Sequence, residues 1–223
     1  TRLSRGLGDV YKRQGLGDPF LVSEEIALIA KRLAQQGLQQ IRRLVVDDSA
    51  FSSALDLPLE SGADDPYAAR NSALAANFNT VNLAWNTEQQ IISAEPQTPL
   101  TEVARSLGRG LAPGQPQRVN LGSNPELGLA QVQQLFAYFL ADAGIVLADD
   151  RFYREPLTDD WQLVYRHRSS RALRDILVGM LRYSNNFIAN QLFLTLGAQA
   201  SGYPATTETS QEALKAQLAA LYG

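Results

Sequence analysis

Residues 174–198 contain two apolar helical patterns that are separated by three polar residues. The break is Ser184-Asn185-Asn186, which places a hydroxyl and a carboxamide two residues apart. This pattern predicts two buried helices whose junction points Ser184 and Asn186 into a cleft. The apolar residues that recur at helical spacing on either side are Ile176, Leu177, Met180, Leu181, Ile188, Leu192, Phe193 and Leu196.

A simpler role is open to the same tripeptide. Ser and Asn are preferred helix N-caps, because their side-chain oxygens accept hydrogen bonds from the free N–H groups of the first turn. Taken alone, the tripeptide is more typical of a cap than of a catalytic element. Its function therefore depends on the rest of the sequence.

Composition excludes several classes of protein. With 223 residues and 45% hydrophobic content, the chain can bury a substantial core. It has no cysteine and a single histidine, which rules out thiol catalysis and leaves little for a zinc site, so we predict no metal and no cofactor. The net charge is -3 with dispersed Lys and Arg, which argues against nucleic acid as a partner. The longest apolar stretch, residues 135–148, is too short to cross a bilayer.

The N-terminal residues differ in character from the rest of the chain. The peptide SRGLGDVYKRQ, residues 4–14, resembles the translation of a transposase sequencing adapter, in which GATGTGTATAAGAGACAG reads Asp-Val-Tyr-Lys-Arg-Gln. We therefore interpret residues 1–14 as non-native and leave them out of the predicted fold. On this interpretation the gene continues upstream, and the chain is expected to be truncated at both ends.

The remaining sequence alternates between helical and strand patterns and predicts an α/β fold. Helices are predicted at residues 23–36, 100–107, 127–143 and 210–221, in addition to the two around Ser184, and Ser23 is expected to cap the first of them. Strands are predicted at residues 41–47, 77–85, 118–121, 145–147 and 161–168.

Four separated segments share the order and approximate spacing of one family. They are GDPFLVSEEI from Gly17, LVVDDSAF from Leu44, NFNTV from Asn77 and LRYSNNFIANQLFLTLG from Leu181. Through these segments the chain resembles the D-alanyl-D-alanine carboxypeptidase/endopeptidase family, the class C low-molecular-mass penicillin-binding proteins. The resemblance covers residues 15–223.

The resemblance implies a catalytic role for the tripeptide. Enzymes of this family acylate the serine of a Ser-x-x-Lys motif, use a Ser-x-Asn between helices, and complete the cleft with Lys-Thr-Gly. By position, Ser184 would relay a proton toward the leaving amine, and Asn186 would offer its amide to the substrate backbone and the catalytic lysine. Asn185 occupies the variable middle position and receives no role. The implied ligands are peptidoglycan stem peptides, with β-lactams as acylating inhibitors.

The sequence departs from the family pattern at the other two motifs. Its three lysines are Lys12, Lys31 and Lys215, none of which follows a serine at the required spacing, and Lys-Thr-Gly is absent. We expect both motifs, and a signal peptide for the periplasm, to lie outside this chain. The fragment alone is predicted to be inactive, and the sequence does not determine its oligomeric state.

The family layout implies a partial serine transpeptidase/β-lactamase-like domain with an inserted α/β domain. Residues 15–125 would belong mainly to the insertion and residues 126–223 to the catalytic domain. Two alternatives stay open: a non-catalytic cell-wall-binding protein of the same fold, and an unrelated domain in which Ser184 only caps a helix.

Other polar residues receive simpler interpretations. His167 is expected at a surface or strand edge, with no visible partner. The acidic pairs, such as Asp47-Asp48 and Asp149-Asp150, are typical of solvated turns. A basic group could face an acidic stem peptide, although a solvated face is the simpler prediction; its members are Arg166, Arg168, Arg171 and Arg174.

Overall fold

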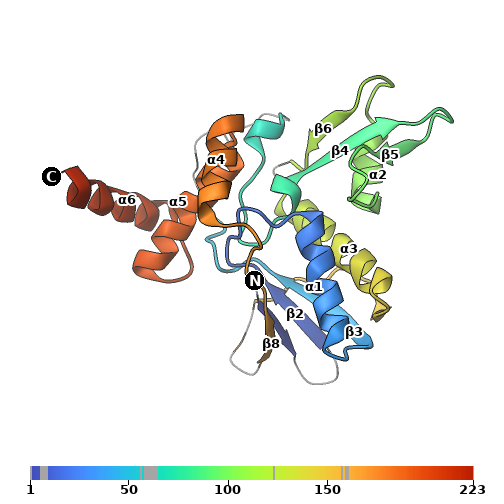
Figure 1. Cartoon of the computed structure of the whole chain (residues 1–223), viewed down its shortest axis with the longest axis horizontal. Coiled ribbons are helices and arrows are strands. Elements are labelled where there is room, and N and C mark those ends of the chain that lie inside the picture. The colour runs from blue at the N-terminus through green and yellow to red at the C-terminus, as the bar shows by residue number, and fades with distance from the viewer. Residues whose placement is uncertain are drawn as a thin grey trace.

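A computed structural model of the chain describes residues 2–5, 10–55, 57, 65–122, 124–156, 158 and 161–222. Within these residues two β-sheets combine with six α-helices, as Figure 1 shows. The predicted fold class is therefore confirmed at the level of a mixed α/β structure. No helix in the described ranges is both long enough and apolar enough to span a bilayer.

The larger sheet has the strand order β7-β3-β2-β1-β8. β3 runs parallel to both β2 and β7, whereas β1 is antiparallel to β2 and β8. Parallel neighbours need a crossover connection, and helices α1 and α3 lie within these connections. The elements are β1 (Arg2–Arg5), β2 (Val10–Gln14), α1 (Ser23–Gln35), β3 (Gln40–Asp47), α3 (Pro125–Asp142), β7 (Val146–Asp149) and β8 (Gln162–Arg166).

Helices α1 and α3 share one hydrophobic core with this sheet. On α1 the buried residues Ile26, Ile29 and Leu33 recur at helical spacing, and on α3 Leu129 and Phe136 enter the same core. The predicted domain boundary after residue 125 therefore separates residues that belong to one hydrophobic core. The assignment of residues 126–223 to a catalytic domain stays a prediction.

Two strands of the larger sheet, β1 and β2, come from residues 2–5 and 10–14, within the segment excluded from the predicted fold. β2 lies between β1 and β3 and pairs with β3 from Val10 to Gln14. The exclusion of these residues from the fold is wrong, because any backbone with free N–H and C=O groups can fill a strand position. Their non-native origin stays a prediction. Lys12 and Arg13 are each only 1% exposed, which is unusual for charged residues in an internal strand.

The smaller sheet is antiparallel and has the order β5-β4-β6. Helix α2 packs on it, with Val81, Leu83, Val103, Ala104 and Leu121 in the shared core. Thr101 begins α2 by accepting a hydrogen bond from the N–H of Ala104 at 3.0 Å. The elements are β4 (Thr80–Trp85), β5 (Ile91–Ser93), α2 (Glu102–Gly108) and β6 (Gln117–Asn120).

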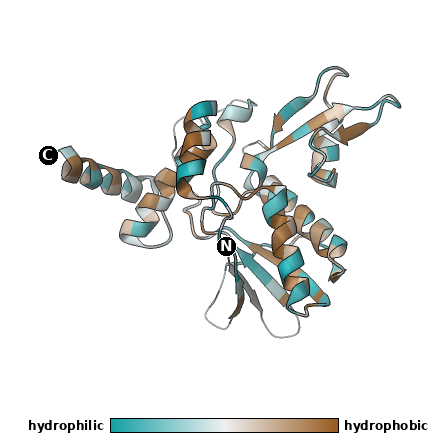
Figure 2. Cartoon of the chain, viewed as in Figure 1, coloured by the Kyte–Doolittle hydropathy of each residue, from teal (hydrophilic) through white to brown (hydrophobic). Residues whose placement is uncertain are grey.

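A helical part follows the larger sheet and consists of α4 (Leu173–Tyr183), α5 (Asn186–Ser201) and α6 (Thr207–Tyr222). α5 and α6 approach closely at Gly197, where a Cβ atom would lie 2.2 Å from the Oγ of Ser210. Figure 2 shows hydrophobic residues along α4, and of these Leu173, Leu177 and Leu181 are exposed at helical spacing. This side of α4 is therefore an apolar surface.

The predicted helices and strands are confirmed to within a few residues, with two corrections. The strand predicted at residues 77–85 begins only at Thr80, because a left-handed turn, η2 (Asn77–Asn79), precedes it. Ser23 does not cap α1; instead its N–H donates to Oδ1 of Asn77 at 2.9 Å. The N-terminus of α1 is thus satisfied by a distant segment of the chain.

Candidate active site

Ser184 ends α4 and lies in the left-handed conformation, with φ 49° and ψ 47°. The N–H of Asn185 closes this end of the helix by donating to the carbonyl oxygen of Met180 at 3.0 Å. A left-handed conformation costs a residue other than glycine roughly 1–2 kcal/mol. Such strain is typical of functional sites, where the surrounding structure holds the residue in place.

The cap of the following helix is Asn185 rather than Ser184. Its Oδ1 accepts a hydrogen bond from the N–H of Ile188 at 3.0 Å, so Asn185 is the N-cap of α5. The alternative in which Ser184 is the N-cap of α5 is therefore wrong, and Ser184 is instead the C-cap residue of α4. Within the described part of the chain the exposed hydroxyl of Ser184 makes no hydrogen bond. It is free to contact a ligand.

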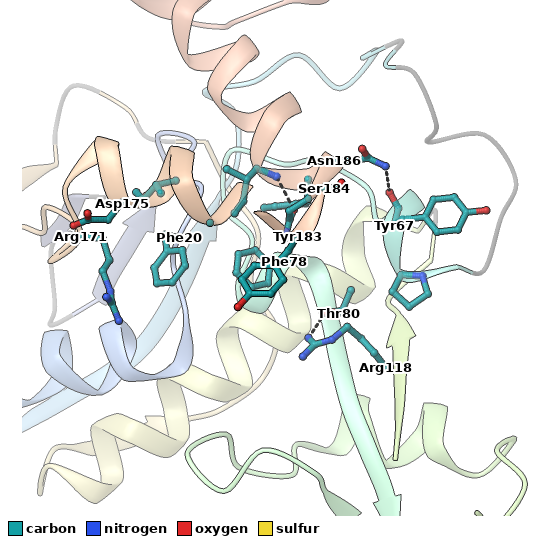
Figure 3. Close-up of a pocket in the computed structure, with 16 residues that line it drawn as sticks. Phe20, Tyr67, Phe78, Thr80, Arg118, Arg171, Asp175, Tyr183, Ser184 and Asn186 are labelled. Atoms are coloured by element: carbon teal, nitrogen blue, oxygen red, sulfur yellow. Dashed lines mark hydrogen bonds between the residues drawn. The ribbon is translucent and has the colours of Figure 1, made fainter. Parts of the chain in front are cut away.

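Asn186 is the first residue of α5 and is half-buried. Its Nδ2 donates to the carbonyl oxygen of Tyr67 at 3.3 Å, as Figure 3 shows. Tyr67 belongs to a short 3₁₀ helix, η1 (Pro66–Ala68). This hydrogen bond is long, so a ligand amide or carbonyl could replace it at little cost.

Ser184 and Asn186 line a cavity of about 800 Å³. Helices α4 and α5 form one side of it, and η1, η2 and Thr80 at the start of β4 form the other, so that the cavity lies between segments far apart in the sequence (Figure 3). Three phenylalanine side chains give it an apolar lining: Phe20, Phe78 and Phe187. Both predicted site residues, Ser184 and Asn186, therefore line the same cavity.

The charged residues of the lining are Arg118, Arg171 and Asp175. Arg118 donates to the Oγ1 of Thr80 at 3.0 Å and forms an ion pair with Glu95. Arg171 lies with its guanidinium carbon 5.7 Å from the ring centroid of Phe20. Of the basic group that the sequence suggested, Arg171 lines the cavity, whereas Arg166, Arg168 and Arg174 do not.

The expected surface position of His167 is wrong. The residue is 5% exposed, and its Nε2 lies 2.7 Å from Oε2 of Glu25, which is itself 4% exposed. Burial lowers the pKa of His167, although the neighbouring carboxylate of Glu25 acts in the opposite direction. Glu25 also accepts a hydrogen bond from the N–H of Ser170. These contacts fix the segment that leads into α4.

Two residues of the acidic pairs, Asp48 and Asp149, form ion pairs with arginines. Asp48 receives two hydrogen bonds from Arg154, at 2.9 and 3.0 Å, and Asp149 receives two from Arg151. Among the described residues, no group of three or more His, Asp or Glu side chains could hold a metal ion.

Sequence reasoning missed the contribution of η2 to the site. Asn77, Phe78 and Asn79 have φ values of 50°, 60° and 56°, and Phe78 lines the cavity. Alternation of polar and apolar residues predicted a strand through these positions. The two asparagines could have indicated a left-handed turn, because Asn tolerates positive φ better than most residues.

Comparisons with known proteins bear on this geometry. A model of the D-Ala-D-Ala carboxypeptidase 3 (S13) family matches residues 4–115 and 109–222. The chain is similar in structure to penicillin binding protein 4 (dacB) from Haemophilus influenzae, with a TM-score of 0.69 and 18% sequence identity. A structure of that protein complexed with a novel β-lactam (CMV) gives a TM-score of 0.61 and 17% identity.

In both comparisons the match covers 99% of this chain and 56% of the other. The chain therefore spans little more than half the length of these similar structures. At this level of identity the likeness shows the fold alone. No curated protein matches the chain.

Proposed function

The chain belongs to the D-Ala-D-Ala carboxypeptidase 3 (S13) family, and from this premise we propose that it is part of a serine-type D-Ala-D-Ala carboxypeptidase/endopeptidase acting on peptidoglycan stem peptides. One observation carries the proposal. The hydroxyl of Ser184 is not used by the helix cap and lines the same cavity as Asn186. A free hydroxyl and a carboxamide beside a cavity are the groups that the Ser-x-Asn motif supplies in serine peptidases of this kind.

In the proposed reaction a nucleophilic serine attacks the carbonyl carbon of the penultimate D-Ala. The amide bond to the terminal D-Ala then breaks, and the leaving amine takes up a proton. Ser184 would relay that proton, and Asn186 would donate its amide N–H to the substrate backbone. Water finally hydrolyses the acyl-enzyme ester, which releases the shortened peptide.

On this proposal the nucleophile would come from residues outside this chain, since the sequence itself contains no Ser-x-x-Lys. We therefore propose that these residues form part of a transpeptidase-like catalytic domain together with an inserted domain. The exposed apolar side of α4 would be covered by the remainder of that domain. The chain by itself is expected to be inactive toward peptides and β-lactams.

The proposed substrate implies a location and a class of inhibitor. Stem peptides are found in the cell wall, so the whole protein would work in the periplasm. β-Lactams resemble the D-Ala-D-Ala terminus and would acylate its serine. The similar protein from Haemophilus influenzae has been seen complexed with a β-lactam, which supports this part of the proposal.

A second candidate is a non-catalytic cell-wall-binding protein of the same fold. The absence of Ser-x-x-Lys and Lys-Thr-Gly from the sequence favours it. On this alternative the cavity would bind stem peptides without cleaving them.

Labelling by a fluorescent penicillin separates the two candidates. A longer reading frame from the same locus should encode Ser-x-x-Lys and give a protein that is labelled covalently, whereas the 223-residue chain should not be labelled. In the longer protein, Ser184→Ala should slow labelling strongly. Asn185→Ala, which removes the cap of α5 at a neighbouring position of the same cavity, should slow it much less. A longer protein that lacks the serine, or resists labelling, would favour the non-catalytic alternative.

A further inference from the structure

Phe78 differs from its neighbours in exposure. From residue 73 to residue 81 every side chain is buried except that of Phe78, which is half-buried. Phe78 is also the largest apolar residue of this stretch, and it lines the cavity that contains Ser184. The ring therefore packs on one side against the buried cluster of Ala69, Ala75 and Phe187 and lines the cavity with its exposed part.

The backbone that carries this ring is held in an unfavourable conformation. Phe78 has φ 60° and ψ 28°, which is rare for a bulky residue. The residues on each side hold it there. Asn77 exchanges two hydrogen bonds of 2.9 Å with Ser23, and Nδ2 of Asn79 donates to the carbonyl oxygen of Arg70 at 2.9 Å. Strain that is enforced from both sides is a feature of ligand-binding sites.

The position of the ring is also fixed by two other aromatic side chains. Its centroid lies 5.8 Å from that of Phe20 and 6.2 Å from that of Phe187, both in edge arrangements. Phe187 directly follows Asn186 in α5. The ring of Phe78 is therefore held in a set position relative to the Ser-x-Asn segment, as Figure 3 shows for the labelled residues.

We propose that Phe78 is a substrate-contacting residue whose ring supports the aliphatic groups of the stem peptide when its D-Ala terminus lies at Ser184 and Asn186. This inference rests on the proposed function. The methyl groups of the two D-Ala residues are the apolar groups nearest the bond to be cleaved. A fixed ring surface binds such methyl groups without an additional loss of side-chain entropy.

The test uses the 223-residue chain and a synthetic L-Ala-γ-D-Glu-L-Lys-D-Ala-D-Ala pentapeptide. Saturation of the aromatic protons of the protein should transfer to the D-Ala methyl protons, and these methyl signals should shift upfield in the ring current. Phe78→Leu keeps an apolar side chain without a ring, so it should abolish the shift and weaken binding about three- to tenfold. Phe78→Tyr should keep both signals. The matched control is Tyr138→Leu, at an exposed aromatic residue that does not line the cavity.

Two results would overturn the inference. If the peptide binds and Ser184→Ala or Asn186→Ala weakens it, but Phe78→Leu leaves the methyl shifts unchanged, the role of Phe78 is wrong and the proposed site stands. If the unmodified chain does not bind the peptide, or if no aromatic proton transfers saturation to its methyl groups, the role of Phe78 is excluded without the use of any variant. A complete lack of binding would also count against the proposed function.

Discussion

Oδ1 of Asn185 lies 3.0 Å from the backbone nitrogen of Ile188 and accepts its hydrogen bond at the start of α5. This contact separates two roles that the sequence left combined in one tripeptide. All three residues line the cavity, but Asn185 is the one whose side chain caps α5, which leaves the hydroxyl of Ser184 outside the cap. The separation can be measured.

Asn185→Ala should lower the free energy of unfolding by about 1 kcal/mol, because the first turn of α5 loses its cap. Ser184→Ala should change it by less than about 0.5 kcal/mol, since the hydroxyl makes no hydrogen bond among the described residues. Urea denaturation followed by circular dichroism would measure both values. Equal losses for the two variants would contradict the assignment of the cap.

Asn77→Ala should lower the free energy of unfolding by about 1–3 kcal/mol, because it leaves the buried N–H and hydroxyl of Ser23 without this partner. Asn77→Asp keeps the oxygen that accepts from the Ser23 N–H but adds a charge at a buried position, so it should cost less than Asn77→Ala only at a pH low enough to protonate the carboxylate. Thermal unfolding of the two variants provides the comparison. If Asn77→Ala were neutral, the side chain would not be what holds the left-handed turn.

Stability should decrease as the pH falls below about 6.5, the ordinary pKa of histidine. Burial lowers the pKa of His167 in the folded chain; Glu25 and Asp18 oppose this effect, and Arg13 adds to it. The unfolded chain therefore binds more protons than the folded chain between the lowered pKa and about 6.5. The free energy of unfolding is therefore highest above about pH 6.5 and decreases as the pH falls from there toward the lowered pKa of His167.

His167→Gln retains a side-chain donor for Glu25 but does not titrate. Denaturation midpoints measured between pH 7.5 and pH 5 should depend less on pH in this variant than in the unmodified chain. An unchanged slope would show that groups other than His167 account for the acid sensitivity.

Arg13→Met should change the free energy of unfolding by about 1–3 kcal/mol, because Arg13 is buried in an internal strand. Loss of the desolvated charge raises the free energy of unfolding, and loss of the contacts of the guanidinium, the ring of Phe136 among them, lowers it. Burial lowers the pKa of Arg13 well below its ordinary value, even though its guanidinium carbon lies 3.7 Å from the ring centroid of Phe136. Arg42→Met, at an exposed position of β3, is the matched control and should have little effect.

The same pair of variants tests the interpretation of residues 1–14. A strand selected for this internal position would carry apolar side chains, as internal strands of parallel sheets do. A gain in stability from Arg13→Met alone supports a non-native origin. A loss would show that the chain depends on the arginine.

Much of the secondary structure could be predicted because it depends on local periodicity. Ile26, Ile29 and Leu33 identify α1 from their spacing alone, and the apolar residues on either side of Ser184 identify α4 and α5 in the same way. The family could also be identified from four short segments. Each of these signals is contained within a short stretch of the chain.

The sequence by itself determined that Ser184 and Asn186 lie at a junction between two helices, because helix patterns and their interruption are local properties. Only the tertiary structure decided which residue caps α5, where His167 lies and which ring faces the cavity. Glu25 meets His167, and Ser23 meets Asn77, across 142 and 54 residues of chain. Contacts between residues so far apart in the sequence leave no periodic signal, because they depend on how the whole chain packs.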